Sequence, residues 1–183
     1  MSDAELSVPR VASSRRVHEG WLSLRIDRLR YPDGQESTAE VVEHGGGVTL
    51  VAFDADGKLL MVRQYRHPTG RVLLELPAGT IDAGEDPEVC AGRELQEETG
   101  YRPRRIEKLG GFYSAPGFCS EYLHVFLCSD LVESRLQGDE VQIAPQALPL
   151  DDVLAMIAAG EIEDAKTSGA LLLYLQRRES ANA

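Results

Sequence analysis

The stretch GTIDAGEDPEVCAGRELQEETGY, residues 79–101, carries the strongest structural signal in this chain. Asp86 followed by Pro87 predicts the start of a helix, because an aspartate N-cap accepts a hydrogen bond from the first turn and proline suits the first helical position. Gly100 predicts the end of that helix, since glycine readily adopts the left-handed conformation found there. The sequence therefore predicts a helix over about residues 87–99.

Three glutamates, Glu94, Glu97 and Glu98, lie at spacings that place them on one face of this helix. Like charges at such spacings repel, at a cost of a few tenths of a kcal/mol per pair. A divalent cation would turn the repulsion into ligation, and Mg²⁺ prefers a few carboxylates together with waters and substrate phosphates. By spacing alone, a solvated acidic helix face is the commoner explanation.

The residues around the helix favour the metal site. Gly79 opens a loop in which the backbone can approach a phosphate or offer a carbonyl to a metal. Arg93 can pair with Glu97 one turn away, and Glu85 can interact with the helix dipole or brace Arg93. Gly92 in the helix interior costs about 1 kcal/mol relative to alanine, which suggests close packing beneath it. A solvated face requires none of these choices.

The stretch resembles the Nudix box, GX5EX7REUXEEXGU, in which U is an aliphatic or bulky apolar residue. The residues that match its fixed positions are Gly79, Glu85, Arg93, Glu94, Leu95, Glu97, Glu98 and Gly100. Tyr101, bulky but not aliphatic, is the one soft departure. The resemblance implies a metal-dependent hydrolase that cleaves a nucleoside diphosphate linked to another moiety X.

The same resemblance assigns metal ligands. Glu94 and Glu98 would be the principal ligands, the carbonyl of Ala78 another, and Glu97 a further or water-mediated one. The implied cofactor is Mg²⁺, with Mn²⁺ as the alternative, at two or three ions per site. Such ions would neutralise the diphosphate while an ordered water attacks phosphorus.

Further catalytic residues also follow from the resemblance, with Glu97 among them. Arg93 would orient the carboxylates and Glu85 would support the loop. In ADP-ribose pyrophosphatases the general base often comes from a loop near the last strand, where this chain offers Asp139 and Glu140. A carboxylate near metal ions stays ionised and can take a proton from water. Of the two, we prefer Glu140 by alignment of the pair DE before the strand with the subfamily. A solvated loop acid is the alternative reading.

Outside the box, the chain is similar to the ADP-ribose pyrophosphatase subfamily from about residue 20 to 176, which implies hydrolysis of ADP-ribose to AMP and ribose 5-phosphate. The implied substrate-binding residues are Arg66, Glu75, Pro116 and Gly117. Each has a plainer reading: a surface arginine, a carboxylate paired with a neighbouring arginine, and a turn between strands. Relatives often carry arginine where this chain has Ala39. The identity of X therefore stays open, and the substrate could be another nucleoside diphosphate sugar. A different class of protein, a non-catalytic domain that senses ADP-ribose, is the other alternative.

Apolar alternation and turn residues predict a mixed sheet with a few helices, which is an α+β protein or an α/β/α sandwich. The resemblance implies the Nudix α/β/α sandwich with a mixed sheet, plus a small N-terminal antiparallel β subdomain. We expect a flexible tail over 1–17, a β subdomain over 18–45 that forms a homodimer by resemblance to the subfamily, and a Nudix hydrolase domain over 46–183. Segments 48–53 and 58–66 are expected to form a hairpin across the turn DADG. Pro145 predicts an edge strand.

Composition bounds the partners. The net charge of −11 over 183 residues argues against a general nucleic-acid binder, which needs clustered Lys and Arg. The 3 cysteines form no CxxC pair, which is typical of a reducing compartment. The start of the chain lacks the apolar core of a secretory signal, and the apolar runs are too short to span a bilayer. We therefore expect a cytoplasmic enzyme with a small-molecule substrate and no membrane partner.

Overall fold

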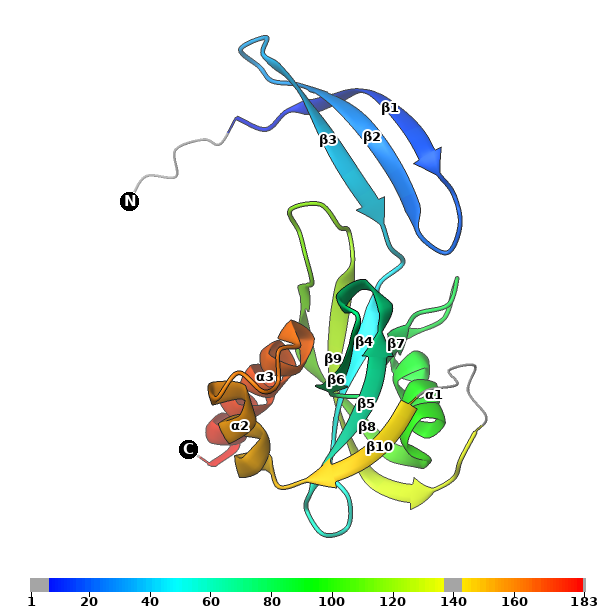
Figure 1. Cartoon of the computed structure of the whole chain (residues 1–183), viewed down its shortest axis with the longest axis vertical. Helices are drawn as coiled ribbons and strands as arrows, with labels where there is room; N and C mark the ends of the chain where they lie inside the picture. Colours follow the sequence, from blue (N-terminus) through cyan, green and yellow to red (C-terminus); the bar gives the residue numbers. More distant parts are fainter. Residues whose placement is uncertain (1–6, 137–142, 183) are drawn as a thin grey trace. The chain divides into compact units, whose positions relative to one another are not determined.

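The computed structural model describes residues 7–136 and 143–182, which divide into two compact units (Figure 1). The first unit comprises Met1–Gly45 and Ala115–Glu121, and the second comprises Gly46–Ser114 and Tyr122–Ala183. The chain passes from one unit to the other within the three glycines at 45–47. The segment Ala115–Glu121 belongs to the first unit although it is far from the rest of that unit in the sequence.

The first unit is built on an antiparallel sheet with the strand order β1–β2–β3. Its strands are β1 (Arg10–His18), β2 (Ser23–Arg30) and β3 (Glu36–Glu43). The expected meander of the second and third strands is present. The expectation of a loose tail over 1–17 is wrong from Arg10 onward. Every residue of β1 is exposed, so the strand is held by backbone pairing with β2 and leaves no apolar pattern in the sequence.

The second unit contains a mixed sheet with the strand order β7–β4–β9–β8, in which β4 and β9 run parallel and the other neighbours are antiparallel. A smaller antiparallel sheet has the order β10–β5–β6. The strands are β4 (Gly47–Ala52), β5 (Leu59–Arg66), β6 (Arg71–Glu75), β7 (Ala78–Thr80), β8 (Tyr101–Tyr113), β9 (Tyr122–Glu133) and β10 (Ile143–Leu148). The mixed sheet predicted from the sequence is confirmed.

The hairpin expected between 48–53 and 58–66 is wrong. The turn itself forms, with the Gly57 amide donating to the Asp54 carbonyl at 3.0 Å. Beyond it, the two strands meet at an isolated bridge between Phe53 and Leu59 and then enter different sheets. The reason is that β4 is buried along its whole length and pairs with β7 and β9 on its two sides. These tertiary partners outweigh the local turn.

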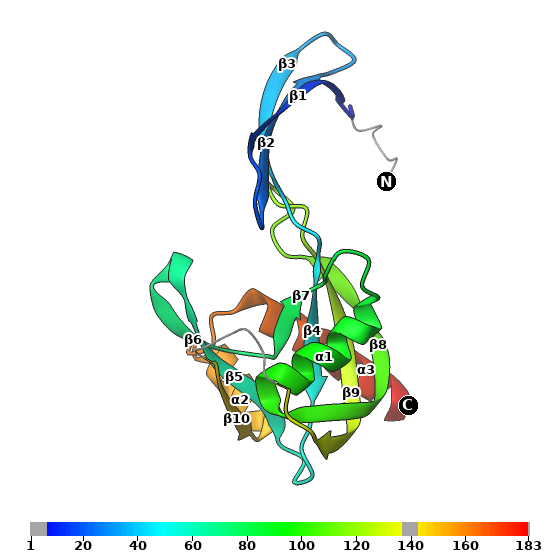
Figure 2. The ribbon, with the colours of Figure 1, turned by 90° about the vertical axis from the view of Figure 1, so that its right-hand side faces the viewer.

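Helices cover both faces of the mixed sheet (Figure 2). The helix α1 (Pro87–Thr99) packs on the face to which β4 contributes Val48 and Leu50. On the other face Val51 packs with α2 (Leu150–Ala158) and α3 (Ala165–Asn182). Alternation along β4 thus supplies both cores, and the predicted α/β/α layering is confirmed.

Shorter features complete the second unit. A 3₁₀ turn, η1 (His67–Thr69), joins β5 to β6. The strand β10 pairs with β5 at one edge of the smaller sheet, with Pro145 opposite Val62, as its proline predicted. In the part of the chain that the structure describes, no helix is long and apolar enough to cross a membrane.

Candidate active site

The helix α1 begins and ends as its sequence predicts. The Asp86 side chain accepts a hydrogen bond from the Glu88 amide at 2.8 Å, and Pro87 occupies the first helical position. Gly100 closes the helix in the left-handed conformation with φ 81° and donates to the Gln96 carbonyl. The apolar side of α1 faces the sheet through Cys90, Ala91 and Leu95, which are buried. This anchoring sets the direction of the glutamates on the remaining surface.

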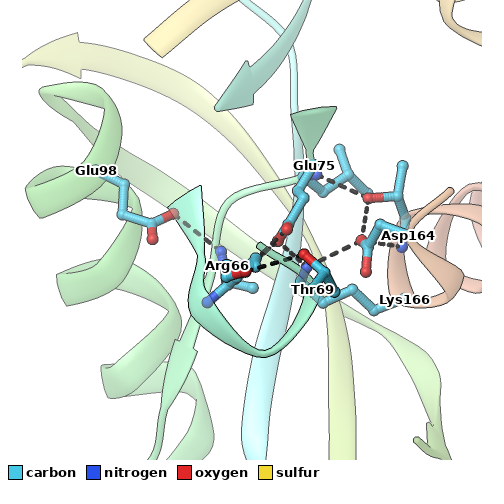
Figure 3. A network of polar contacts seen from close by, with 9 residues as sticks. Arg66, Thr69, Glu75, Glu98, Asp164 and Lys166 are labelled. Atoms are coloured by element: carbon cyan, nitrogen blue, oxygen red, sulfur yellow. Dashed lines mark hydrogen bonds and ion pairs between the residues drawn. The ribbon is translucent and has the colours of Figure 1, made fainter. Parts of the chain in front are cut away.

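Glu98 reaches the strand that precedes the helix. Its side chain is buried, and its Oε2 accepts a hydrogen bond from the Ala78 amide at 3.0 Å (Figure 3). Ala78 is the first residue of β7 and pairs with Thr49 of β4, so the sheet holds its backbone in place. The structure therefore brings together Glu98 and Ala78, which are twenty residues apart in the sequence.

Gly79 makes room for Glu94. A Cβ at position 79 would lie 1.9 Å from the carboxyl carbon of Glu94 and 2.2 Å from both of its oxygens. The Glu94 carboxylate therefore occupies the space that any other side chain would fill. That this glycine also lets the backbone approach a phosphate or offer a carbonyl to a metal stays a prediction from the sequence. Steric room for a neighbouring carboxylate explains the residue directly.

Gly92 does not have the role that the sequence suggested. A Cβ there would meet the Cδ1 atom of Ile106 at 3.6 Å, which is an ordinary van der Waals contact. Close packing beneath the helix therefore does not require glycine at this position, and nothing in the structure explains it.

Arg93 contacts several of the carboxylates around α1. It donates to Glu85 through Nε at 2.9 Å and Nη2 at 2.8 Å, and to Glu94 through Nη1 at 2.7 Å. Its contact with Glu97 is longer, at 3.5 Å. Nη2 also donates to the Thr80 carbonyl at 3.3 Å. The bracing of Arg93 by Glu85 is thus the stronger of the two pairings considered from the sequence.

These contacts keep the charged forms in place. Hydrogen bonds from Arg93 and the Asp82 amide outweigh burial and hold the pKa of Glu85 at about 2. Hydrogen bonding to Glu85 in turn raises the pKa of Arg93, although burial acts against it. Burial, followed by the charges of Glu85 and Glu94, raises the pKa of the Cys90 thiol. Cys90 is therefore a packing residue and not a nucleophile.

The oxygen atoms of this site fit a divalent cation. Among the described residues, no three His, Cys, Asp or Glu side chains converge on a metal position by themselves. The glutamates instead contact Arg93 and the Ala78 amide. The available donors are the carboxylate oxygens of these glutamates, and Mg²⁺ accepts a few such hard ligands and completes its shell with waters and substrate phosphates. The absence of a side chain at Gly79 leaves space for the Glu94 carboxylate among these oxygen donors.

A second charged cluster surrounds Glu75, whose side chain is 1% exposed (Figure 3). Arg66 donates to it through Nε at 3.0 Å and through Nη2 at 2.7 Å. Lys166 donates to the same carboxylate and to Asp164 at 2.9 Å. Burial alone would raise the pKa of Glu75, but hydrogen bonds and charge from Arg66 and Lys166 hold it below its ordinary value. Arg66 and Glu75 are thus brought together. This agrees with the interpretation of Glu75 as a carboxylate paired with a neighbouring arginine.

Two of the remaining predicted residues belong to the first unit, and two are not described. Pro116 and Gly117 are in the segment of the first unit where the Phe118 and Cys119 amides donate to the Ala115 carbonyl at 3.1 and 2.9 Å. Asp139 and Glu140 lie outside the described residues.

Sequence reasoning missed Lys166 and Asp164. The available signal was the run DAKT at 164–167, which places a capping residue directly before the last helix. Nothing in that run indicates that the lysine reaches a carboxylate ninety-one residues earlier in the chain.

The second unit thus combines a mixed sheet between helices with a glutamate-bearing helix packed against the short strand β7. The sequence profile of the NUDIX domain matches residues 43–169. The chain belongs to the Nudix hydrolase family. Hydrolases of the ADP-ribose type in this family generally depend on divalent metal ions.

Individual relatives cover most of the chain. An ADP-ribose pyrophosphatase of Bacillus subtilis (strain 168) is 39% identical over 165 residues, covering 88% of this chain and 89% of the relative. A GDP-mannose pyrophosphatase of Yersinia pestis (strain Pestoides F) is 35% identical over 173 residues, covering 88% and 84%. The crystal structure of an ADP compounds hydrolase matches with a TM-score of 0.84 at 23% identity, over 94% of this chain and 95% of the other. This structural match supports the fold.

Proposed function

We propose that this protein hydrolyses the diphosphate bond of ADP-ribose, giving AMP and ribose 5-phosphate. The observation that carries the proposal is the arrangement along β7, where Glu98 contacts Ala78 and Glu94 fills the space beside Gly79. The similarity to an ADP-ribose pyrophosphatase over most of both chains supports the substrate.

Glu94, Glu98 and the Ala78 carbonyl would hold the metal, with Glu97 as a further or water-mediated ligand. Mg²⁺ is the expected ion, with Mn²⁺ as the alternative, at two or three ions per site. Bound there, the ions neutralise the diphosphate and stabilise the charge that develops on the leaving phosphate. The protein's part is to orient the carboxylates, which Arg93 does for Glu94 through the 2.7 Å hydrogen bond from its Nη1.

The reaction itself needs a water and a base. The water oxygen bonds to one phosphorus while the bond from that phosphorus to the bridging oxygen breaks, and the base takes the proton released by the water. We assign the base to Glu140 on the sequence, with Asp139 as the alternative. Comparing kcat of Glu140→Gln and Asp139→Asn at equal metal affinity decides between them: a larger loss in Asp139→Asn would contradict the assignment.

Substrate contacts are proposed for Arg66, Pro116 and Gly117. A guanidinium suits phosphate and ribose oxygens because its donors lie in one plane. Arg66 is already oriented by its hydrogen bonds to Glu75, so less side-chain freedom is lost on binding. Because Glu75 is buried beneath these contacts, its part is to support Arg66 and not to touch the substrate.

A substrate panel tests the function. Mg²⁺-dependent hydrolysis of ADP-ribose, ADP-mannose, GDP-mannose, NADH and 8-oxo-dGTP would be compared by kcat/KM, and ADP-ribose should be among the best substrates. The alternative, a pyrophosphatase for another nucleoside diphosphate sugar, is supported by the GDP-mannose pyrophosphatase relative. It would win if GDP-mannose or ADP-mannose were clearly preferred. Binding of ADP-ribose without turnover would indicate a sensing domain instead.

We further propose that residues 18–45 form a homodimer and that residues 46–183 carry out catalysis in the cytoplasm. Support comes from Trp21, an apolar side chain in this segment that is 78% exposed in the single chain. Sedimentation equilibrium should give twice the monomer mass. A monomer at micromolar concentration would contradict the dimer without affecting the proposed reaction.

A further inference from the structure

Lys166 lies in the first turn of α3, outside the Nudix box and outside the residues proposed above to touch substrate. Its ammonium group donates to Glu75, which is 1% exposed and ninety-one residues away in the sequence. The lysine side chain is itself only 14% exposed. A lysine is seldom buried unless it is paired, so this contact is a specific feature of the fold.

The position of Lys166 is set by the start of α3. Oδ2 of Asp164 accepts hydrogen bonds from the Lys166 ammonium at 2.9 Å, from the Thr167 amide at 3.0 Å and from the Thr167 hydroxyl at 2.6 Å. The Thr167 hydroxyl also accepts a hydrogen bond from the Leu76 amide at 2.9 Å. The start of the helix is therefore tied to the residue directly after Glu75. These bonds hold the backbone from which the Lys166 side chain extends, and Asp164 holds its ammonium group.

Glu75 in turn determines how Arg66 points. Both carboxylate oxygens are used: Oε1 accepts from Nε of Arg66 at 3.0 Å, while Oε2 accepts from Nη2 of Arg66 at 2.7 Å and from Lys166. Such a two-point contact holds the plane of the guanidinium as well as its place. The main chain of Arg66 is held independently, since its carbonyl accepts from the Thr69 hydroxyl at 2.9 Å and the Gly70 amide at 3.0 Å.

The charges explain why two cations are needed. Glu75 and Asp164 carry two negative charges, and Arg66 and Lys166 carry two positive ones. Without Lys166, one partner of the Oε2 atom is lost and the buried carboxylate depends on Arg66 alone. Arg66 is the most exposed member of the cluster, with a side chain 35% exposed. It would then have to serve the buried carboxylate at the expense of any ligand on its solvent side.

We propose that Lys166 is a positioning residue for substrate binding: through Glu75 it holds the guanidinium of Arg66 in the orientation that contacts the nucleotide sugar. This inference rests on the proposed function, in which Arg66 touches the substrate. Because Lys166 acts on binding and not on the attacking water, its loss should raise KM and leave kcat nearly unchanged.

The test uses Lys166→Met, which keeps most of the side-chain volume and removes the charge, with steady-state kinetics on ADP-ribose. We expect KM to rise about tenfold with kcat within about twofold, since one misaligned charged contact accounts for about one decade in affinity. Lys166→Arg should recover most of this loss. A kcat that falls while KM stays constant would overturn the proposal.

Arg71→Met is the matched control. Arg71 of β6 forms an ion pair with Glu163, just before α3, so the variant also removes an ion pair between this strand and the start of this helix. That pair does not include Glu75, and KM should stay within about twofold of the wild-type value. An equal rise of KM in Arg71→Met and Lys166→Met would show a general loosening and refute the specific role of Lys166.

A double-mutant cycle separates positioning from general stability. In an Arg66→Met background, Lys166→Met should raise KM by less than about twofold, because the group that it positions is gone. Fully additive effects would contradict the inference. If Lys166→Met does not fold, the cycle is run with Asp164→Asn in its place. This variant keeps a capping side chain but weakens the contact that holds Lys166, so we expect KM to rise about threefold.

Failure of the proposed function gives a different result. If wild-type protein does not hydrolyse ADP-ribose but prefers another substrate of the panel, the function is wrong and the cycle is run on the preferred substrate. If wild-type protein hydrolyses ADP-ribose well and Lys166→Met has an unchanged KM, the function stands and the inference is wrong.

Discussion

Two clusters of charged side chains in the second unit differ in their balance of charge. Around α1, Arg93 is the cation in contact with Glu85, Glu94 and Glu97. Around Glu75, two carboxylates meet two cations, and the charges cancel. A cluster with surplus negative charge is stabilised by a bound cation, whereas a neutral cluster is complete within the protein.

The two clusters also differ in how the chain brings them together. The contacts of Arg93 with carboxylates join residues one, four and eight positions apart. Glu75 contacts residues nine and ninety-one positions away. The first cluster follows from one loop and one helix, and the second exists only when α3 packs beside β6. We therefore expect changes around α1 to affect chemistry and changes around Glu75 to affect binding and stability.

The largest effect is expected for Glu98→Gln. The amide oxygen of glutamine can still accept the hydrogen bond from Ala78, so the fold should persist. Loss of a ligand charge should lower kcat about 1,000-fold, because the metal contributes several kcal/mol of transition-state stabilisation. Turnover at saturating Mg²⁺ and a thermal melt of the same sample check this. Near-normal turnover would refute the ligand assignment.

Glu75→Gln tests the neutral cluster. Removing this charge leaves Arg66 and Lys166 facing each other across a neutral amide, and breaking a buried pair in this way should lower the free energy of unfolding by about 3 kcal/mol. Urea denaturation at neutral pH measures it. A change below about 0.5 kcal/mol, the usual range of a surface substitution, would show that solvent already screens the cluster.

Gly79→Ala tests the space beside Glu94. The new methyl group would overlap the Glu94 carboxylate, which lies at the end of a flexible side chain and can move. The protein should therefore fold, with kcat/KM reduced about 100-fold, comparable to the loss of a group that orients a metal ligand. Kinetics and Mg²⁺ titration check it. Unchanged activity would mean that the position of Glu94 is unimportant.

Glu85→Gln tests the hold on Arg93 through pH. The pKa of Glu85 is lowered from 4.5 to about 2, so its contribution to stability is fully present above about pH 4.5 and is lost as pH falls toward 2. The variant should be less stable than wild type by about 2 kcal/mol at pH 7, less than the shift alone implies because solvent screens Arg93. The difference should shrink between pH 4.5 and 2. A difference independent of pH would contradict the assigned cause.

The smallest effect, and the one stabilising change, is expected for Gly92→Ala. The added methyl group would meet Ile106 at an ordinary distance, and alanine is a better helix former. The free energy of unfolding should rise by about 0.5–1 kcal/mol with activity unchanged. A destabilised variant would contradict this prediction and support the close packing beneath Gly92 that the sequence suggested. Placed beside Gly79→Ala, this variant shows which glycine of the box serves the site.

Much of the catalytic helix was predictable because its signals are local. Asp86, Pro87 and Gly100 act on their own neighbours, and the structure confirms the helix that they predict. The hairpin across Asp54–Lys58 was also a local prediction, and it is wrong because β4 pairs with β7 and β9 instead. Local chemistry decides an element unless buried neighbours compete for the same backbone groups.

The sequence by itself determined the family, the boundaries of α1, the match to the Nudix box and the mixed architecture, since each depends on residue types at short, fixed spacings. Only the tertiary structure decided that Gly79 makes room for Glu94 and that Lys166 completes the cluster around Glu75. Both are contacts between side chains or backbone from different elements. Such contacts form when strands and helices pack, and no local pattern in the chain specifies which distant residues will meet.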